Sequence, residues 1–147
     1  MIALKMKVVL ATTYAFQLKA HKFHWNVMGP DFAQYHDYLG ELYEEVFGAV
    51  DMLAEIIRTT GELSPGSFEE FIELSEIISD ESDVTNSLQM INELIEDNKV
   101  LLDVLNDAYE VSEEEDTFDI SDALAGRIAA HRKHGWMLHS FLNKQQV

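Results

Sequence analysis

Histidine is scarce in this chain, and half of the histidines lie in one short stretch. Of the 6 histidines among 147 residues, three fall in HKFHWNVMGPDFAQYH, the segment from His21 to His36. A Gly-Pro pair interrupts the segment, and the sequence contains no cysteine. Without thiolates, a metal site must use histidine, aspartate and glutamate, which suit iron, manganese or zinc. The stretch alone leaves open whether its histidines bind a metal or only pack against their neighbours.

Two carboxylates in the following segment could complete such a site. Asp51 and Glu55 are four residues apart, so they lie on one face of the helix expected there, with the apolar residues MLA between them. Two acids on a partly buried stripe are costly unless something positive joins them. On that helix, Asp51 falls about 60° round from His36 and Glu55 about 100° round.

The spacing places the partners of the histidines in a second copy of the chain. His36 and Asp51 are about 22 Å apart along a helix that rises about 1.5 Å per residue, so they cannot hold one ion within one chain. Two copies that run antiparallel across a two-fold axis would bring His36 of one to Asp51 and Glu55 of the other. His24, at the end of the preceding helix, lies at the same corner. The residues therefore predict a site shared between two copies.

The elements that must position these residues are expected to be helices. The composition is 47% hydrophobic and 25% charged with only 2 prolines and 7 glycines, which favours a single domain of long helices over residues 1–147. Apolar residues recur at helical spacing and show no sustained alternation of strand type. We expect long helices over residues 2–27, 32–60, 84–111 and, from an Asp116 or Thr117 cap, to 142, with a short helix near 68–77. This layout is an all-α, ferritin-like four-helix bundle with a short helix in the middle crossover connection.

Turn and cap residues predict where these helices begin and end. Pro30 disfavours helical backbone at Gly29, so the first helix should end before that pair. Asp31 is a suitable N-cap for the second helix, and Gly61 a suitable residue to end it. The acids of DESD, residues 80–83, are expected to cap the third helix.

A di-iron site inside one bundle is not expected. Such sites use a Glu-x-x-His motif on two of the four helices, and none of the 6 histidines here has a glutamate three residues before it. The last expected helix carries three histidines without an acid at the matching turn. Surface or packing roles are expected for His131, His134 and His139.

With this ligand spacing in view, the chain resembles the Dps family, the mini-ferritins named as DNA-binding proteins from starved cells. The family pattern is His-Trp-Asn, a histidine twelve residues later, and Asp-x-x-x-Glu fifteen residues after that. Here these are His24-Trp25-Asn26, His36 and Asp51 to Glu55. The closing HRKHGWMLHSFL also resembles the family's last helix, so the resemblance covers most of the chain.

The resemblance implies a hollow shell of twelve subunits built from two-fold dimers, with ferroxidase centres at the dimer interfaces. Such a protein is an oxidoreductase that oxidises Fe(II), with hydrogen peroxide preferred over oxygen, stores ferric mineral and protects against oxidative damage. His24, His36, Asp51 and Glu55 are then the iron ligands and catalytic residues, and Zn or Mn could substitute for iron. Trp25 would lie near the iron, where it could donate an electron to stray oxidant or simply pack at the helix end.

One departure from the family pattern concerns the second iron. The family usually has an acid four residues after the second histidine, where this chain has Gly40. Glu44 is offered as a stand-in, because it lies about 80° round from His36 on the ligand-bearing side, but a solvated or interface acid is the more ordinary role for such a residue. One iron is therefore expected to bind tightly and a second weakly. Two alternatives stay open: a non-catalytic Dps-like shell that binds other divalent metals, and an acidic helical interaction protein without a metal site.

The charge of the chain bears on its partners. Asp and Glu number 27 against 10 Lys and Arg, which gives a net charge of −17. Such a surface repels DNA and anionic lipid, because both are bound through Lys and Arg. We expect no DNA binding near neutral pH without bridging cations. No apolar run reaches membrane-spanning length and no clear cleavage site follows the apolar start, so a cytoplasmic protein is expected.

An acidic segment at the start of the last helix is a further candidate site. Acids there suit the positive end of the helix dipole and are often merely solvated. In the Dps family, acids in this region line pores at one type of three-fold axis and guide Fe(II) inward. Asp122 matches that position best, followed by Asp119 and Asp116.

Overall fold

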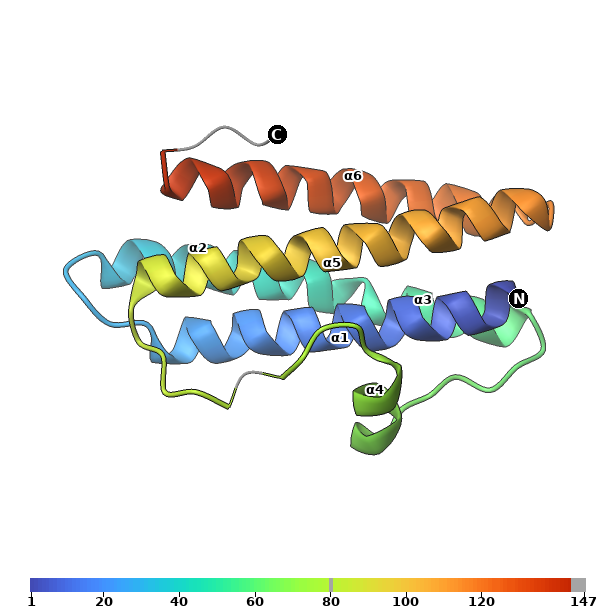
Figure 1. Ribbon diagram of the computed structural model, residues 1–147, viewed down its shortest axis with the longest axis horizontal. Helices are drawn as coiled ribbons and strands as arrows, with labels where there is room; N and C mark the ends of the chain where they lie inside the picture. Colours follow the sequence, from blue (N-terminus) through green and yellow to red (C-terminus); the bar gives the residue numbers. More distant parts are fainter. Residues whose placement is uncertain (80, 144–147) are drawn as a thin grey trace.

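The computed structural model describes residues 1–79 and 81–143 and shows a bundle of helices (Figure 1). Its helices are α1 (Ile2–Asn26), α2 (Phe32–Gly48), α3 (Val50–Thr59), α4 (Phe68–Leu74), α5 (Ser87–Glu114) and α6 (Phe118–Phe141). Within these described ranges no residue belongs to a strand, so the expected all-α fold is confirmed. None of the helices described is long and apolar enough to cross a membrane.

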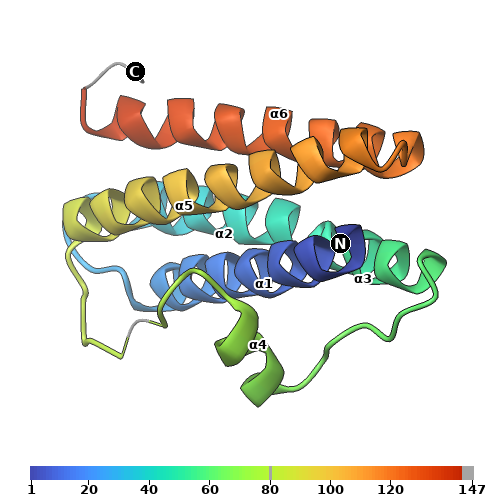
Figure 2. The same ribbon diagram turned by 45° about the vertical axis from the view of Figure 1, so that its right-hand side comes forward.

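The long helices lie side by side as four rods. The α1 helix packs against α2 and α3 on one side and α5 on the other, while α6 packs along α5 (Figures 1 and 2). The crossover from α3 to α5 runs back along the length of the bundle and carries α4, which packs on the outside of α1. The short helix in the middle connection is therefore where the sequence predicted it.

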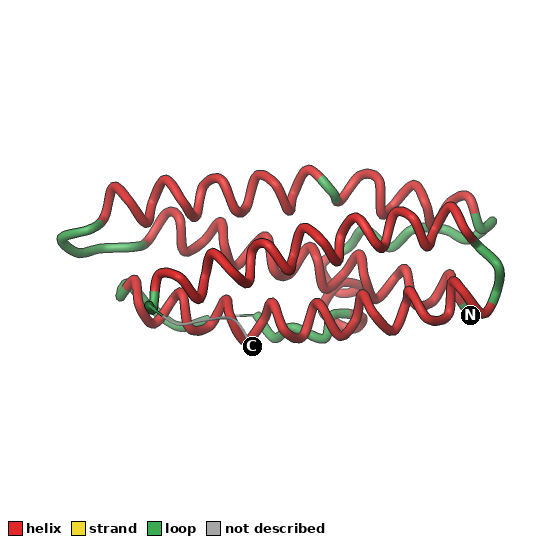
Figure 3. The backbone as a smooth tube through the Cα atoms, turned by 90° about the horizontal axis from the view of Figure 1, so that it is seen from above, coloured by secondary structure: helices red, strands yellow, loops and turns green. Residues whose placement is uncertain are grey.

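The second rod is interrupted, whereas a single helix over residues 32–60 was expected. Gly48 ends α2, and the N–H of Ala49 bonds to the carbonyl of Val46 at 3.1 Å, a tighter turn than an α-helix makes. Ala49 keeps φ −85° and ψ −15°, so the chain continues in the same direction and α3 extends the rod (Figure 3). Glycine at position 48 has low helix propensity, which is the local reason for the break.

Turn residues end several helices as expected. Gly29 and Gly61 have φ of 131° and 92°, a region that side chains disfavour, and they follow the ends of α1 and α3. Asp31 and Thr117 stand at the N-cap positions of α2 and α6, but neither side chain makes a capping hydrogen bond. Their position was predicted correctly, while their bonding was not.

The third long helix needs a correction. It begins three residues later than expected, because Asn86 caps it: the Asn86 side-chain oxygen accepts from the Gln89 N–H at 3.0 Å. Of the DESD acids expected there, Asp80 lies outside the described residues, and the other two, Glu81 and Asp83, precede the cap. The short helix α4 begins with a capping box formed by Ser67 and Glu70, and it ends three residues earlier than expected.

The core is apolar and continuous between the rods. Its largest fully buried side chains come from α1, α2, α3 and α5 and include Met6, Leu10, Phe16, Phe23, Leu39, Leu53, Ile57, Met90, Leu94, Leu101 and Leu105. One ion pair, 2.6 Å long between Lys19 and Asp97, crosses from α1 to α5 at largely buried positions. Burial of this apolar surface is the main stabilising term and holds the rods in register.

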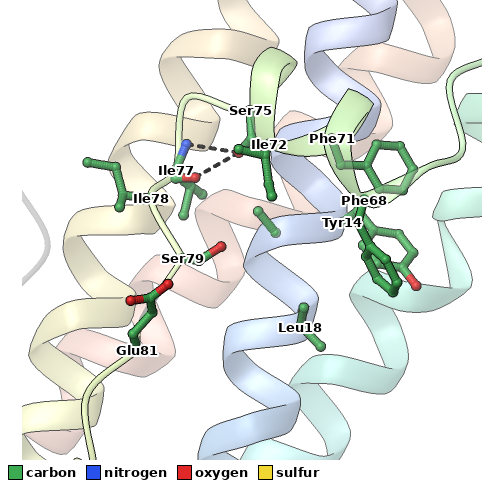
Figure 4. Close-up of a pocket in the computed structure, with 11 residues that line it drawn as sticks. Tyr14, Leu18, Phe68, Phe71, Ile72, Ser75, Ile77, Ile78, Ser79 and Glu81 are labelled. Atoms are coloured by element: carbon green, nitrogen blue, oxygen red, sulfur yellow. Dashed lines mark hydrogen bonds between the residues drawn. The ribbon is translucent and has the colours of Figure 1, made fainter.

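An apolar groove is lined by α1, α4 and the turn that follows α4 (Figure 4). The ring of Tyr14 on α1 stacks on that of Phe71 on α4, with centroids 4.8 Å apart. In the turn after α4, the Ser75 hydroxyl donates to the Ile77 carbonyl at 2.9 Å and accepts from the Ile77 N–H at 3.0 Å, which fixes that turn. The groove therefore has a defined shape in a single chain.

Candidate metal centre

Two histidines face each other across the Gly-Pro turn between α1 and α2. The imidazoles of His24 and His36 are stacked, with centroids 3.8 Å apart and planes 15° from parallel. Next to His24, the turn is tied to the start of α5, because the Met28 N–H donates to the Thr85 carbonyl at 2.9 Å. The backbone at this corner is therefore held from two sides, as a binding site requires.

Each imidazole is bonded to the backbone of the other residue. His24 Nδ1 lies 2.6 Å from the His36 carbonyl oxygen, and His36 Nδ1 lies 2.7 Å from the His24 carbonyl oxygen. Because a carbonyl only accepts, both Nδ1 atoms carry the hydrogen. The lone pair of each neutral ring is then on Nε2, the state in which histidine binds a metal. The pair is fixed in tautomer and orientation before any ion arrives.

Further rings surround this pair. His21 stacks on Tyr43 with centroids 3.7 Å apart and lies 3.9 Å from the ring of Trp25. Partial burial and then the neighbouring His24 lower the pKa of His21, while the charge of Glu44 opposes that shift. His21 thus belongs to an aromatic cluster beside the histidine pair, and Glu44 lies close enough to act on it electrostatically.

The two predicted acids lie on α3. Asp51 and Glu55 are both exposed, and Asp51 lies close enough to act on the Glu55 carboxyl. The neighbouring Asp51 side chain, and then its charge, raise the pKa of Glu55. Two neighbouring carboxylates that disfavour each other's ionisation mark a position where a cation would be favoured.

One chain does not bring the four predicted ligands together. His24 pairs with His36 and Asp51 with Glu55, but the described residues of a single chain contain no cluster of three or more His, Asp or Glu side chains that could hold a metal. The sequence predicted this separation from the distance along the helix. A complete centre would therefore need a second copy.

Comparison with known proteins identifies the family. The Ferritin-like domain family matches residues 5–147. The DNA protection during starvation protein 2 of Bacillus anthracis is 32% identical over 126 residues, which cover 86% of each chain. The chain belongs to the Dps family of ferritin-like proteins. The resemblance noted in the sequence is confirmed.

Solved Dps structures have the same fold. The Dps protein of Bacillus brevis superposes with a TM-score of 0.91 at 30% identity, covering 96% of this chain and 94% of that one. The Dps protein of Vibrio cholerae, described as a ferritin-like diiron-carboxylate protein, gives a TM-score of 0.92 at 25% identity and covers 96% and 88%. The ferritin-like layout predicted from the helical pattern is thus the layout of the Dps fold.

The acids predicted to line a pore lie away from the histidine corner of this Dps chain. Asp116, Asp119 and Asp122 are exposed and three residues apart at the start of α6. The α5–α6 turn is at the opposite end of the bundle from the α1–α2 turn (Figure 1). The three side chains are open to solvent. A pore would exist only in an assembled shell, so the pore stays a prediction.

A polar network in the bundle of this Dps chain escaped the sequence analysis. The Glu45 carboxylate accepts two hydrogen bonds from Arg127, at 2.7 and 3.0 Å, and lies 2.6 Å from His134 Nε2. The bond to His134, and then the bonds and charge of Arg127, hold the pKa of Glu45 well below its usual range. These contacts join α2 to α6 and so close the fourth side of the bundle.

The network continues into the core. His131 is fully buried, with Nδ1 2.9 Å from Asn98 Oδ1 and Nε2 3.2 Å from an Arg127 nitrogen. Burial, and then the charge of Arg127, lower the pKa of His131 well below its usual value. Packing is therefore the role that the structure gives His131 and His134. The signal in the sequence was the spacing of 127, 131 and 134, three basic residues on one face of α6.

Proposed function

We propose that this protein binds Fe(II) at a centre shared between two copies of the chain, oxidises it, and stores the ferric product inside a hollow shell of twelve. The observation that carries the proposal is the division of the ligands into two prepared halves. His24 and His36 present Nε2 lone pairs at one corner, and the carboxylates of Asp51 and Glu55 lie on α3 close enough to act on each other. Membership of a ferritin-like family supports iron as the metal.

Exposed apolar side chains flank both halves, as an interface with a second copy requires. Trp25 is 59% exposed beside the histidine pair, and Phe32, 44% exposed, stacks 5.0 Å from His36. Phe47 and Met52, 52% and 40% exposed, flank the acids in the sequence. Apolar surface around polar ligands is typical of a site that becomes buried on association.

The ligand chemistry suits Fe(II) oxidation. Two imidazoles and two carboxylates would bind the ion and leave coordination positions free for the oxidant. Hydrogen peroxide takes one electron from each of two Fe(II) ions and two protons, and yields two Fe(III) ions and two water molecules. Paired use of the electrons avoids release of a hydroxyl radical, which is the basis for protection against oxidative damage.

The remaining expectations follow from charge. Asp122, Asp119 and Asp116 would attract Fe(II) to a pore by focusing negative potential. With a net charge of −17, the chain is expected not to bind DNA near neutral pH. We also propose that the protein is cytoplasmic. Glu44 is the proposed stand-in for the acid missing at Gly40.

Mixing experiments test the proposal directly. Metal-free protein is titrated with Fe(II) without oxygen and then mixed with hydrogen peroxide in a stopped-flow spectrometer, with ferric absorbance as the readout. We expect one tight Fe(II) per centre and fast oxidation, both lost in a His24→Ala, His36→Ala double variant. Two equally tight ions per centre would contradict the single-iron expectation, and oxidation no faster than in buffer would refute a ferroxidase.

A second candidate function rests on Gly40, which supplies no ligand where the family usually has an acid. The protein would then be a shell that binds divalent metals such as Zn(II) without oxidising iron. It predicts tight metal binding in the same titration with no ferric absorbance after peroxide. The stopped-flow trace therefore separates the two functions.

A further inference from the structure

Gly40 lies in α2 directly beneath the imidazole of His24. A Cβ atom built on Gly40 would lie 2.9 Å from His24 Cε1 and 3.1 Å from His24 Nδ1, too close for ordinary contact. Gly48 on the same helix and Gly126 on α6 have nothing within 4 Å of such an atom. Close packing against a side chain therefore distinguishes Gly40 from the other helical glycines compared.

The His24 ring has little freedom to move away. It is stacked on His36 at 3.8 Å, and its Nδ1 atom is bonded to the His36 carbonyl at 2.6 Å. To reach normal contact distance from a new Cβ, the ring would have to shift by about half an ångström, since carbon atoms pack at about 3.5–4.0 Å. Such a shift would lengthen the short hydrogen bond that fixes the tautomer of His24.

Glycine in the interior of a helix otherwise has a cost. It destabilises a helix by about 1 kcal/mol relative to alanine, and the backbone of Gly40 does not need a left-handed conformation. The absent side chain leaves space for the His24 ring, and the Cβ of an alanine would fill that space.

We propose that Gly40 is a positioning residue of the metal centre, whose missing side chain seats the His24 imidazole in its bonded, metal-accepting orientation. The effect on iron rests on the proposed function, whereas the effect on the ring does not. Gly40 is therefore not only the position where the acid usual in the family is missing. It also helps to hold the His24 ring in place.

The test compares Gly40→Ala with Gly126→Ala in the full-length protein. Both changes favour helix, so both variants should fold, which thermal unfolding followed by circular dichroism verifies. Imidazole nitrogen NMR of the metal-free proteins, assigned with His24→Gln and His36→Gln, reports the Nδ1–H tautomers. We expect the His24 signal to change in Gly40→Ala and to stay unchanged in Gly126→Ala.

Anaerobic Fe(II) titration of the same proteins gives the second readout. Affinity should fall about 10- to 100-fold in Gly40→Ala, the usual effect of disturbing the partner that orients a metal-binding histidine, and remain at the wild-type value in Gly126→Ala. Wild-type affinity or an unchanged His24 signal in Gly40→Ala would overturn the inference. If the wild-type protein itself binds no iron while the His24 signal still changes in Gly40→Ala, the proposed function fails and the positioning role stands.

Discussion

At the scale of single residues, the protein prepares its histidines by hydrogen bonds to the backbone. His24 and His36 each donate from Nδ1 to the other's carbonyl, so both rings are oriented in the absence of metal. In the core a side chain orients the ring instead: His131 Nδ1 bonds to Asn98 Oδ1, and the ring is shielded from water. Burial thus separates a structural histidine from the two that remain accessible.

The burial of His131 makes stability depend on pH. Its folded-state pKa is lowered, so the unfolded chain, with a pKa near 6.5, takes up a proton that the folded chain does not. Stability is therefore full above that value and falls as the pH drops below it, by up to about 1.4 kcal/mol per pH unit for one group. Chemical denaturation at pH 7.5, 6.5 and 5.5 should show this loss, and His131→Asn should have a flatter profile. Equal slopes for the two proteins would contradict the assignment.

At the scale of elements, the structure depends on contacts that join helices far apart in the sequence. The Glu45 carboxylate on α2 holds Arg127 and His134 on α6, and these bonds close the bundle. Removing one partner of a buried ion pair leaves the other charge without compensation. A single polar change on the α2–α6 side should therefore destabilise the fold.

Replacing Glu45 tests this closure. We expect Glu45→Gln to lower the free energy of unfolding by roughly 1–3 kcal/mol, less than for a fully buried pair because the Glu45 side chain is 41% exposed. Urea denaturation measures the change. Glu44→Gln, at the exposed neighbouring position, is the matched control and should change stability little. An equal effect of the two substitutions would mean that the network does not stabilise the bundle.

The helices could be predicted from periodicity, but their interruptions and polar partners could not. The Gly-Pro turn and Gly61 have conformations that the residue types dictate, so the ends of α1 and α3 were predictable. The break at Ala49 follows Gly48, but Gly40 causes no break in the same helix, so residue type alone does not locate the break. Asn86 caps α5 although acids stand just before it in the sequence. The stacking of His24 over Gly40 joins two helices and has no local sequence signal.

At the scale of the whole molecule, charge is expected to direct iron. The exposed acids at the start of α6 would form rings of three around a three-fold axis in a shell and concentrate cations there. These acids lie at the far end of the bundle from the histidine corner (Figure 1). Iron entry and iron oxidation should therefore respond separately to substitution.

Asp122→Asn tests the pore. We expect iron to enter the shell several-fold more slowly, because the potential at the pore weakens, while binding of a few Fe(II) ions at the centre stays normal. Mineral formation after repeated additions of Fe(II) measures entry, and anaerobic titration measures binding. Asp103→Asn, an exposed acid on α5, is the control. A loading rate equal to that of the wild type would exclude Asp122 from the entry path.

The central claim is that each centre takes its histidines from one copy and its acids from another. Two double variants each remove one half of the site. One carries His24→Ala and His36→Ala, and the other carries Asp51→Asn and Glu55→Gln. Alone, each should lack ferroxidase activity. Shells reassembled from an equal mixture of the two should recover roughly a quarter of the wild-type activity, because half of the two-fold dimers are mixed and each mixed dimer has one intact centre of two. Mixed shells as inactive as the two parents would contradict a shared centre.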